Sequence, residues 1–117
     1  MRLRLAVPVA LLLVALAPAA TPQHQHGAPA RTSDPASTRE FQAANARMHK
    51  DMNIRFTGDA DRDFAAGMIP HHQGAIDMAR TQLRHGKDPE LRRLAEDILA
   101  AQEREIAQLR TILARLK

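Results

Sequence analysis

The sequence contains no cysteine, no tryptophan, no tyrosine and only three phenylalanines in 117 residues. Without cysteine the chain forms no disulfide, cannot be a lipoprotein, and offers a metal only nitrogen, oxygen or thioether ligands. The scarcity of aromatic side chains argues against stacking on nucleic acid bases or sugars. The chain also lacks a glycine-rich phosphate loop, and its serines, Ser33 and Ser37, lie at the edge of the segment expected to be disordered. These absences favour a protein that is not an enzyme.

The chain begins with a pattern typical of a secretory signal peptide. Arg2 and Arg4 form a basic start, residues 5–16 are mostly apolar, and small residues follow at Ala17 and Ala19. The apolar run is shorter than the roughly 20 residues that a membrane-spanning helix needs. We therefore expect residues 1–20 to be removed during Sec-type export, which leaves a periplasmic or secreted protein with no membrane span.

The charge balance also excludes a class of partner. Removal of Arg2 and Arg4 lowers the formal net charge from +4 to 4 − 2 = +2. Acidic and basic residues are interspersed along the chain, as on solvated helix surfaces. Nothing in this balance predicts binding to nucleic acid.

Residues 21–36 are rich in proline, glycine, glutamine and alanine, which predicts a flexible tail. This tail contains His24 and His26. Two interpretations stay open: a linker that happens to contain histidines, or a weak metal-collecting segment.

Residues 37–117 are expected to form one small helical domain. Ser37 and Glu40 match a capping box, and apolar residues at helical spacing continue to about Ile54. The Thr57–Asp61 segment contains a glycine and two aspartates, one of which can cap the next helix.

The second helix is predicted from about Asp61 to His85, with Gly86 just beyond its end. The third begins at Asp88-Pro89, where a capping residue precedes a proline, and continues to the C-terminus. The short connections predict an all-α fold: a small antiparallel up-and-down bundle of three main helices.

The second helix carries an unusual set of side chains, Met68, His71, His72 and Met78. At about 100° per residue, His72 lies about 40° to one side of Met68 and His71 about 60° to the other. A buried imidazole needs a polar partner, and a metal ion can be that partner. The alternative is that the methionines are ordinary core residues.

Pro70 precedes the two histidines. Inside a helix, proline removes a backbone hydrogen bond and can produce a kink that re-aims the side chains after it. The alternative is that the second helix simply starts near Pro70.

The first helix offers a matching group in the sequence MHKDM. Met48 and Met52 are four residues apart and share a side, with His49 beside them. If the two helices form an antiparallel hairpin, we expect one site made of three histidines and four methionines. Imidazole suits Cu(II) and thioether sulfur suits Cu(I), so the predicted cofactor is a copper ion in either state. The predicted metal ligands are Met48, His49, Met52, Met68, His71, His72 and Met78.

The stretch DADRDFAAGMIPHHQGAIDMA, preceded by MHKDM and followed by LAEDILAAQEREIAQL, resembles the exported bacterial family catalogued as domain of unknown function 305. The resemblance extends from about Phe41 to the C-terminus. It implies a ferritin-like helical bundle and periplasmic copper binding through the same seven methionine and histidine residues. One departure is Leu109, where the family commonly has a methionine.

The leading hypothesis is thus a non-catalytic copper-binding protein that buffers copper, confers resistance to it or delivers it, with a copper-transfer protein or a second copy as possible partners. A metal-independent helical interaction or dimerisation module is the alternative. A ferritin-like di-iron enzyme is disfavoured, because the chain contains no Glu-x-x-His pair.

Overall fold

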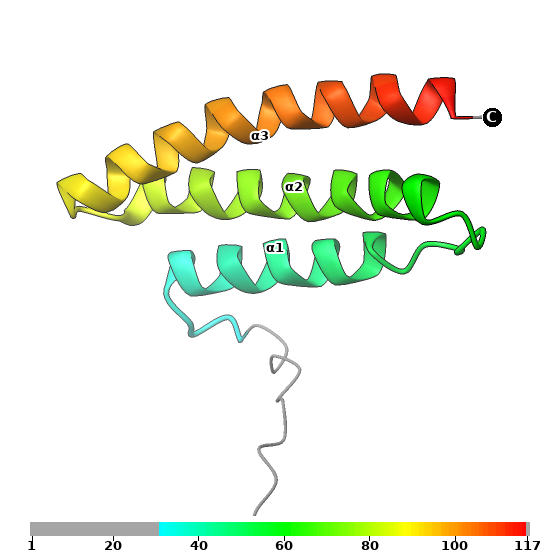
Figure 1. The fold of residues 1–117 in the computed structure, drawn as a ribbon. Coiled ribbons are helices and arrows are strands. Elements are labelled where there is room, and N and C mark those ends of the chain that lie inside the picture. Colours follow the sequence, from blue (N-terminus) through cyan, green and yellow to red (C-terminus); the bar gives the residue numbers. More distant parts are fainter. Residues whose placement is uncertain (1–30, 117) are drawn as a thin grey trace, which may run out of the picture.

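Three antiparallel helices make up the fold. The structure, a computed structural model, describes residues 31–116. Helix α1 spans Ala36–Asp51, α2 spans Ala60–His85 and α3 spans Pro89–Arg115, and they run alternately up and down (Figure 1). The described residues form no strand. The predicted all-α, up-and-down helical bundle is therefore confirmed.

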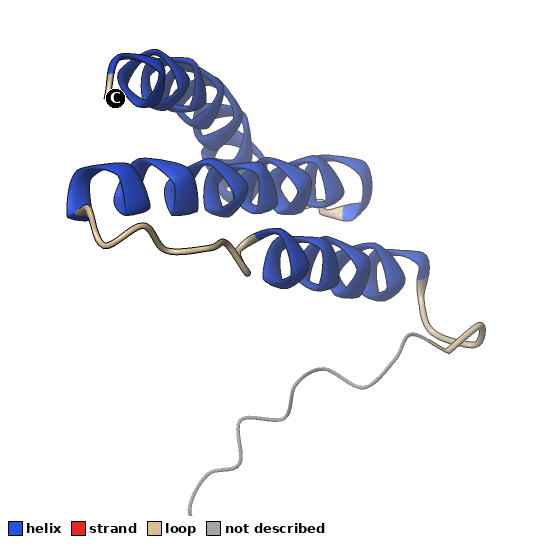
Figure 2. Ribbon diagram, turned by 90° about the vertical axis from the view of Figure 1, so that its right-hand side faces the viewer, coloured by secondary structure: helices blue, strands red, loops and turns tan. Residues whose placement is uncertain are grey.

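Helix α2 lies in the middle of this arrangement. Both α1 and α3 pack against α2, while within the described part of the chain they make no contact with one another. Figures 1 and 2 show the three helices as a single layer with α2 between its neighbours. Helix α2 therefore has two packed sides, and no other described residues cover the two broad faces of the layer.

The start of α1 differs from the expectation. The N-cap is Pro35, and no side chain caps the first turn, so the predicted Ser37–Glu40 capping box is wrong. The reason is that α1 begins at Ala36, so Ser37 lies inside the first turn and not at the N-cap. The Glu40 carboxylate accepts a hydrogen bond from Arg84 and pairs with His85 at the end of α2. The helix also ends at Asp51, before the expected end at Ile54.

The start of α2 follows the prediction. Asp59 is the N-cap, and its carboxylate accepts hydrogen bonds from the amides of Asp61 and Arg62. Gly58 in the preceding loop has a φ of 89°, a conformation that disfavours other residues. The helix continues without interruption through Pro70, so the alternative that it begins there is wrong.

Side chains form hydrogen bonds with backbone groups at the end of α2 and at the start of α3. Asp88 caps α3 through the amides of Glu90 and Leu91, with Pro89 at the first helical position, as predicted. The Arg92 guanidinium donates to two backbone carbonyl groups near the end of α2. These bonds satisfy helix-terminal groups and make α3 turn back along α2.

The buried core is thin and consists mainly of small side chains. The buried hydrophobic residues are Ala44, Ala65, Ile76, Ala79, Ala95 and Ile106. Alanines at the interfaces let the helix backbones approach closely but bury little apolar area. Several larger apolar side chains, including Phe64 and Leu94, are exposed.

Among residues 31–116, no helix is long and apolar enough to cross a membrane. The predicted signal peptide, residues 1–20, lies outside the described residues, as do His24 and His26. Their roles stay predictions.

Glu40 makes the stability of the α1–α2 contact depend on pH. The hydrogen bond from Arg84, assisted by one from His85, holds the pKa of the Glu40 carboxyl below its ordinary value of 4.5. A carboxyl whose pKa is lower in the folded state contributes stability above its unfolded pKa and loses that stability as pH falls through its folded pKa.

We therefore expect Glu40→Gln to lower the free energy of unfolding at neutral pH and to have little effect well below pH 4.5. Urea unfolding followed by circular dichroism across this pH range measures the difference. Glu96→Gln is the matched control, because the exposed Glu96 side chain makes no hydrogen bond or ion pair with residues 31–116. If the free energy of unfolding depended on pH in the same way for both variants, the assignment of this pH dependence to Glu40 would be contradicted.

Candidate metal centre

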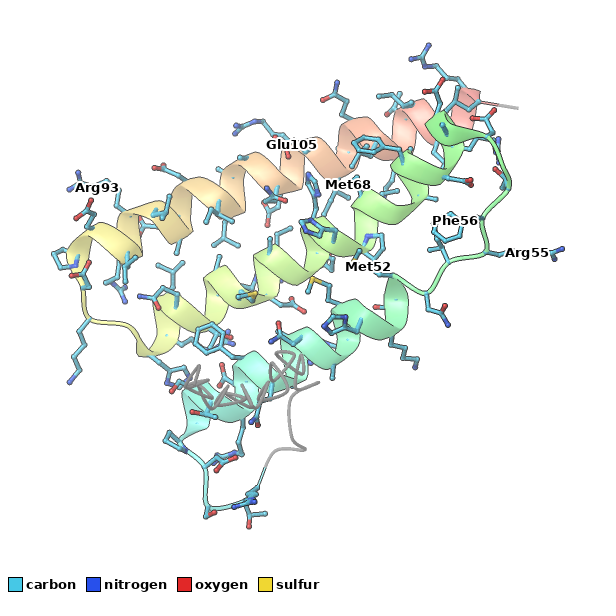
Figure 3. The ribbon with its side chains drawn as sticks, turned by 60° about the horizontal axis from the view of Figure 1, so that its bottom comes forward. Met52, Arg55, Phe56, Met68, Arg93 and Glu105 are labelled. Atoms are coloured by element: carbon cyan, nitrogen blue, oxygen red, sulfur yellow. The ribbon has the colours of Figure 1, made fainter. Side chains whose placement is uncertain are left out.

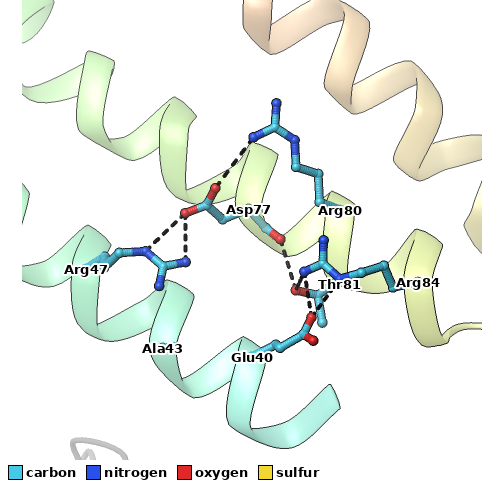
Figure 4. A pocket seen from close by; sticks show the side chains of 7 residues that line it. All are labelled: Glu40, Ala43, Arg47, Asp77, Arg80, Thr81 and Arg84. Carbon is cyan, nitrogen blue, oxygen red and sulfur yellow. Dashed lines mark hydrogen bonds and ion pairs between the residues drawn. The ribbon is translucent and has the colours of Figure 1, made fainter. Parts of the chain in front are cut away.

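One broad face of the helix layer is charged. Ion pairs link Arg47 on α1 to Asp77 on α2 at 3.0 Å, and Arg80 on α2 to Glu103 on α3 at 3.5 Å. Figure 4 shows the shallow pocket at this face, with Arg84 reaching Glu40 beside the Arg47–Asp77 pair. We call this the charged face; its residues are Glu40, Arg47, Asp77, Arg80, Arg84 and Glu103.

The other broad face of α2 carries the methionines and one histidine. Residues nine apart in a helix lie about 180° apart around its axis, at 100° per residue. Met68, His71 and Ala75 precede Asp77, Arg80 and Arg84 by nine positions. They therefore lie opposite the charged face. We call this side the Met/His face; its α2 residues are Phe64, Met68, His71, Ala75 and Met78.

The register of α1 on α2 is fixed by glycines of α2. A Cβ atom on Gly74 would lie 2.5 Å from Met48 Sδ, and one on Gly67 would lie 3.7 Å from Ile54 Cδ1. The Met48 side chain thus occupies the space that a glycine leaves. The part of α1 between these contacts runs beside the α2 segment that contains Met68 and His71.

His49 and Met52 extend the Met/His face onto α1. They follow Arg47 by two and five residues, so they lie about 200° and 140° around α1 from that charged side chain. Figure 3 shows Met52 at the end of α1 and Met68 on α2. The register and the helix faces together bring Met48, Met52 and His71 to one side of the α1–α2 contact.

The two adjacent histidines point in different directions. His71 is exposed, whereas His72 is buried with 8% of its surface exposed. His72 Nε2 lies 2.7 Å from Glu105 Oε2 on α3. Because His72 lies two residues from Gly74, which faces α1, its side chain is on the opposite side of α2. The ring centroids of His71 and His72 are 5.9 Å apart.

The seven predicted ligands therefore do not form one cluster. Met48 and His49 belong to α1 and Met52 is its C-cap, while Met68 and His72 lie one turn apart on the side of α2 nearer α3. His71 lies between these two sets of residues, and Met78, which is 40% exposed, lies two turns beyond it along α2. A single ion cannot bind all seven, because the α2 backbone separates His72 from the α1 side chains.

The second ring nitrogen of His72, Nδ1, is the atom most relevant to metal binding. His72 Nδ1 is buried and has no hydrogen-bond partner among residues 31–116. The Glu105 carboxylate accepts a hydrogen bond from Nε2, which leaves Nδ1 with its lone pair in a neutral ring. Metal-binding histidines usually have this arrangement, with one nitrogen on the metal and the other donating to a carboxylate. The residues fit a metal ion at Nδ1.

The donor types restrict which metal could bind. Within the described region, no group of three or more His, Asp or Glu side chains is arranged to hold a metal ion. A site in this region needs thioether sulfur as well, and thioether ligands select Cu(I). A di-iron site, which needs several carboxylates, lacks its ligands here.

Sequence reasoning missed Glu105. It lies in the LAEDILAAQEREIAQL stretch that carries the family resemblance, but nothing local shows that it pairs with a histidine on another helix. A weak signal was present: His72 and Glu105 lie at comparable separations along the chain from the turn at Lys87, so an antiparallel hairpin brings them to a similar level.

The chain matches a known protein family. The model of the family described as domain of unknown function (DUF305) matches residues 13–113. The chain belongs to this DUF305 family. It is also similar to the uncharacterized protein L153 of Acanthamoeba polyphaga mimivirus, at 42% identity over 53 residues. That similarity covers 45% of this chain and 35% of the viral protein, so the match spans about a third of the relative's length.

Gly74 provides a test of the α1–α2 register. In Gly74→Ala the new methyl group would overlap the Met48 side chain, and overpacking of this kind costs about 1–3 kcal/mol. We expect the variant to unfold at lower urea concentration.

Gly67→Ala is the control, because its methyl group would make an ordinary contact with Ile54. Replacing a helical glycine by alanine there should stabilise the protein by up to about 1 kcal/mol. Opposite shifts in the two urea midpoints are the expected result. Equal shifts would mean that Met48 does not fill the space at Gly74.

Proposed function

We propose that this DUF305 protein binds copper through methionine and histidine side chains and stores or passes on the ion without catalysing a reaction. The observation that carries the proposal is the buried, unpartnered Nδ1 atom of His72, whose ring is oriented by Glu105. Leaving such an atom without a partner costs about 1–3 kcal/mol. A bound metal ion removes that cost.

Thioether groups near this histidine support copper over other metals. Met68 is four residues before His72, so the two side chains lie on the same side of α2. Methionine sulfur is a soft ligand that favours Cu(I), while imidazole accepts either oxidation state. When bound, copper supplies a soft cation that both donor types can share.

The side chains of α1 support a second copper-binding position, near His71. Met48 packs against Gly74 in the α1–α2 contact, and the exposed Met52 and His71 lie on the Met/His face beside it. An ion held there would be more accessible than one at His72, because His71 and Met52 are exposed. An exposed donor set beside a buried one is suited to taking up and releasing copper. The proposed location is the periplasm or the exterior, where the predicted signal peptide would direct the protein.

The direct test is thermal unfolding with copper. A ligand that binds only the folded state stabilises it by about 2.7 kcal/mol at a hundred times its Kd. We expect Cu(I), added without oxygen, to raise the Tm of the purified protein. The double variant His71→Ala/His72→Ala should lose this increase, whereas His85→Ala, at the charged side, should keep it. The absence of any shift with Cu(I) and with Cu(II) would contradict the proposal.

Glu105 allows a finer test that leaves every ligand in place. Glu105→Gln preserves the size of the side chain but removes the negative charge that makes the His72 imidazole a stronger electron-pair donor to a metal ion. Loss of such a carboxylate typically weakens metal binding about 10–100-fold. Competition with a coloured Cu(I) chelator measures the change. Glu103→Gln is the matched control, since Glu103 pairs with Arg80 on the charged face. Equal affinities of the two variants would argue against His72 as a ligand.

The alternative is a helical interaction module that needs no metal. The exposed apolar side chains of α2 and α3 favour it, because an isolated small domain rarely leaves so many large apolar groups in water. Replacement of Met48, Met52 and Met68 by leucine discriminates the two: the interaction module would be unaffected, while copper binding would be lost.

A further inference from the structure

The Met/His face continues onto α3 as an apolar surface. Leu94 precedes Glu103 by nine residues, so it lies about 180° around α3 from the charged face. Leu91, one turn earlier, lies on the same side. Leu91 and Leu94 are 51% and 52% exposed, and Phe64 on α2 is 63% exposed. One broad face of the layer is therefore charged, and the other is largely apolar.

The exposed apolar area matches that of a protein interface. At about 180 Å² for a large side chain, the exposed fractions of the apolar residues on this face amount to roughly 440 Å². The residues counted are Met52, Phe64, Met78, Leu91 and Leu94. A standard interface buries about 800 Å² on each partner, slightly more than half of it apolar. The face therefore supplies the apolar part of one such interface.

The distribution of these residues favours a second copy as the occupant. Phe64 lies near the start of α2, whereas Leu91 and Leu94 lie near the start of α3, at the opposite end of the layer. When two copies pack antiparallel, the Phe64 end of one meets the leucine end of the other. The contact is reciprocal, as an isologous interface requires.

Charge supports the same choice. The α2 residues of the Met/His face include no Asp, Glu, Lys or Arg. On α3, Glu105 follows Leu94 by eleven residues and so lies on the same side, where His72 Nε2 is its partner. Two copies can therefore bury the α2 strip against each other without removing an unpaired charge from water, which would be costly. A nucleic acid, an acidic peptide or an anionic lipid surface would find no basic side chain on the strip.

We propose that two copies of the chain associate through their Met/His faces, antiparallel about a two-fold axis near the middle of α2. His71 is the twelfth of the 26 residues of α2, so it lies close to this axis. The imidazoles of both copies then meet at the centre of the interface. This association needs no copper and does not rest on the proposed function. A copper ion bound at His71 would have donors from two subunits within reach.

The association state in a metal chelator tests the proposal. We expect the purified protein to sediment as a dimer, and Phe64→Arg and Leu94→Arg to sediment as monomers with unchanged helix content. Both side chains are already exposed, so their replacement spares the fold of the single chain. Gln73→Arg, on the charged side of α2, is the control and should remain dimeric. A monomeric wild-type protein, or a dimer that survives both face variants, would overturn the proposal.

Cross-linking tests the position of the axis. Because the chain has no cysteine, His71→Cys introduces a single thiol on the Met/His face at the middle of α2. A disulfide needs Cα atoms within about 7 Å, so only residues next to the axis can link two copies. We expect mild oxidation to give a covalent dimer for His71→Cys and much less for Gln73→Cys. Equal cross-linking at the two positions would place the interface elsewhere.

These results separate the two proposals. A copper-free dimer that binds no copper would leave this inference standing and remove the proposed function. A monomer whose Tm rises with copper would support the proposed function and overturn the dimer. If the N-terminal 30 residues cover the face within one chain, the protein will sediment as a monomer, which also overturns the dimer.

Discussion

The structure depends on one constraint: α2 is packed on two sides at once. Gly74 receives the Met48 side chain on the side toward α1, and Ala65 and Ala79 lie buried in the same helix. Small residues let the backbones of neighbouring helices come close, and little apolar area is buried in exchange. Because α1 and α3 do not meet, the domain remains a single layer with two faces of opposite character.

This arrangement explains why the histidine pair is divided. Adjacent residues on a helix lie about 100° apart, so a helix that is packed on two sides presents one of them to a neighbour and the other to an open face. His72 is directed to α3 and its carboxylate partner, and His71 to the uncovered side. A buried imidazole with an oriented ring and an exposed imidazole on an apolar surface thus arise from two consecutive residues.

The charged face has a structural role that complements the apolar one. Its ion pairs connect α1 to α2 and α2 to α3 at exposed positions, where each pair contributes little free energy. Their greater effect is on register, because each pair joins one position on one helix to one on the next. The charges also make this face unfavourable for burial, so the proposed dimer would use the opposite face.

Much of the fold was determined by local sequence. Asp59, Asp88 and Pro89 mark helix starts through hydrogen bonds and backbone geometry within a few residues, and the structure has these starts where the sequence predicts them. The Ser37–Glu40 capping box failed because the helix begins at Ala36, which leaves Ser37 inside the first turn, while Glu40 pairs with Arg84, far along the chain. The types of donor for a soft metal were also readable, since they depend on residue chemistry alone. Only the tertiary structure decided that His72 faces Glu105 rather than the methionines of α1, because that depends on which side of α2 each neighbouring helix occupies. Helical periodicity predicts the angle between two side chains on one helix. It does not predict on which side of that helix a neighbouring helix packs.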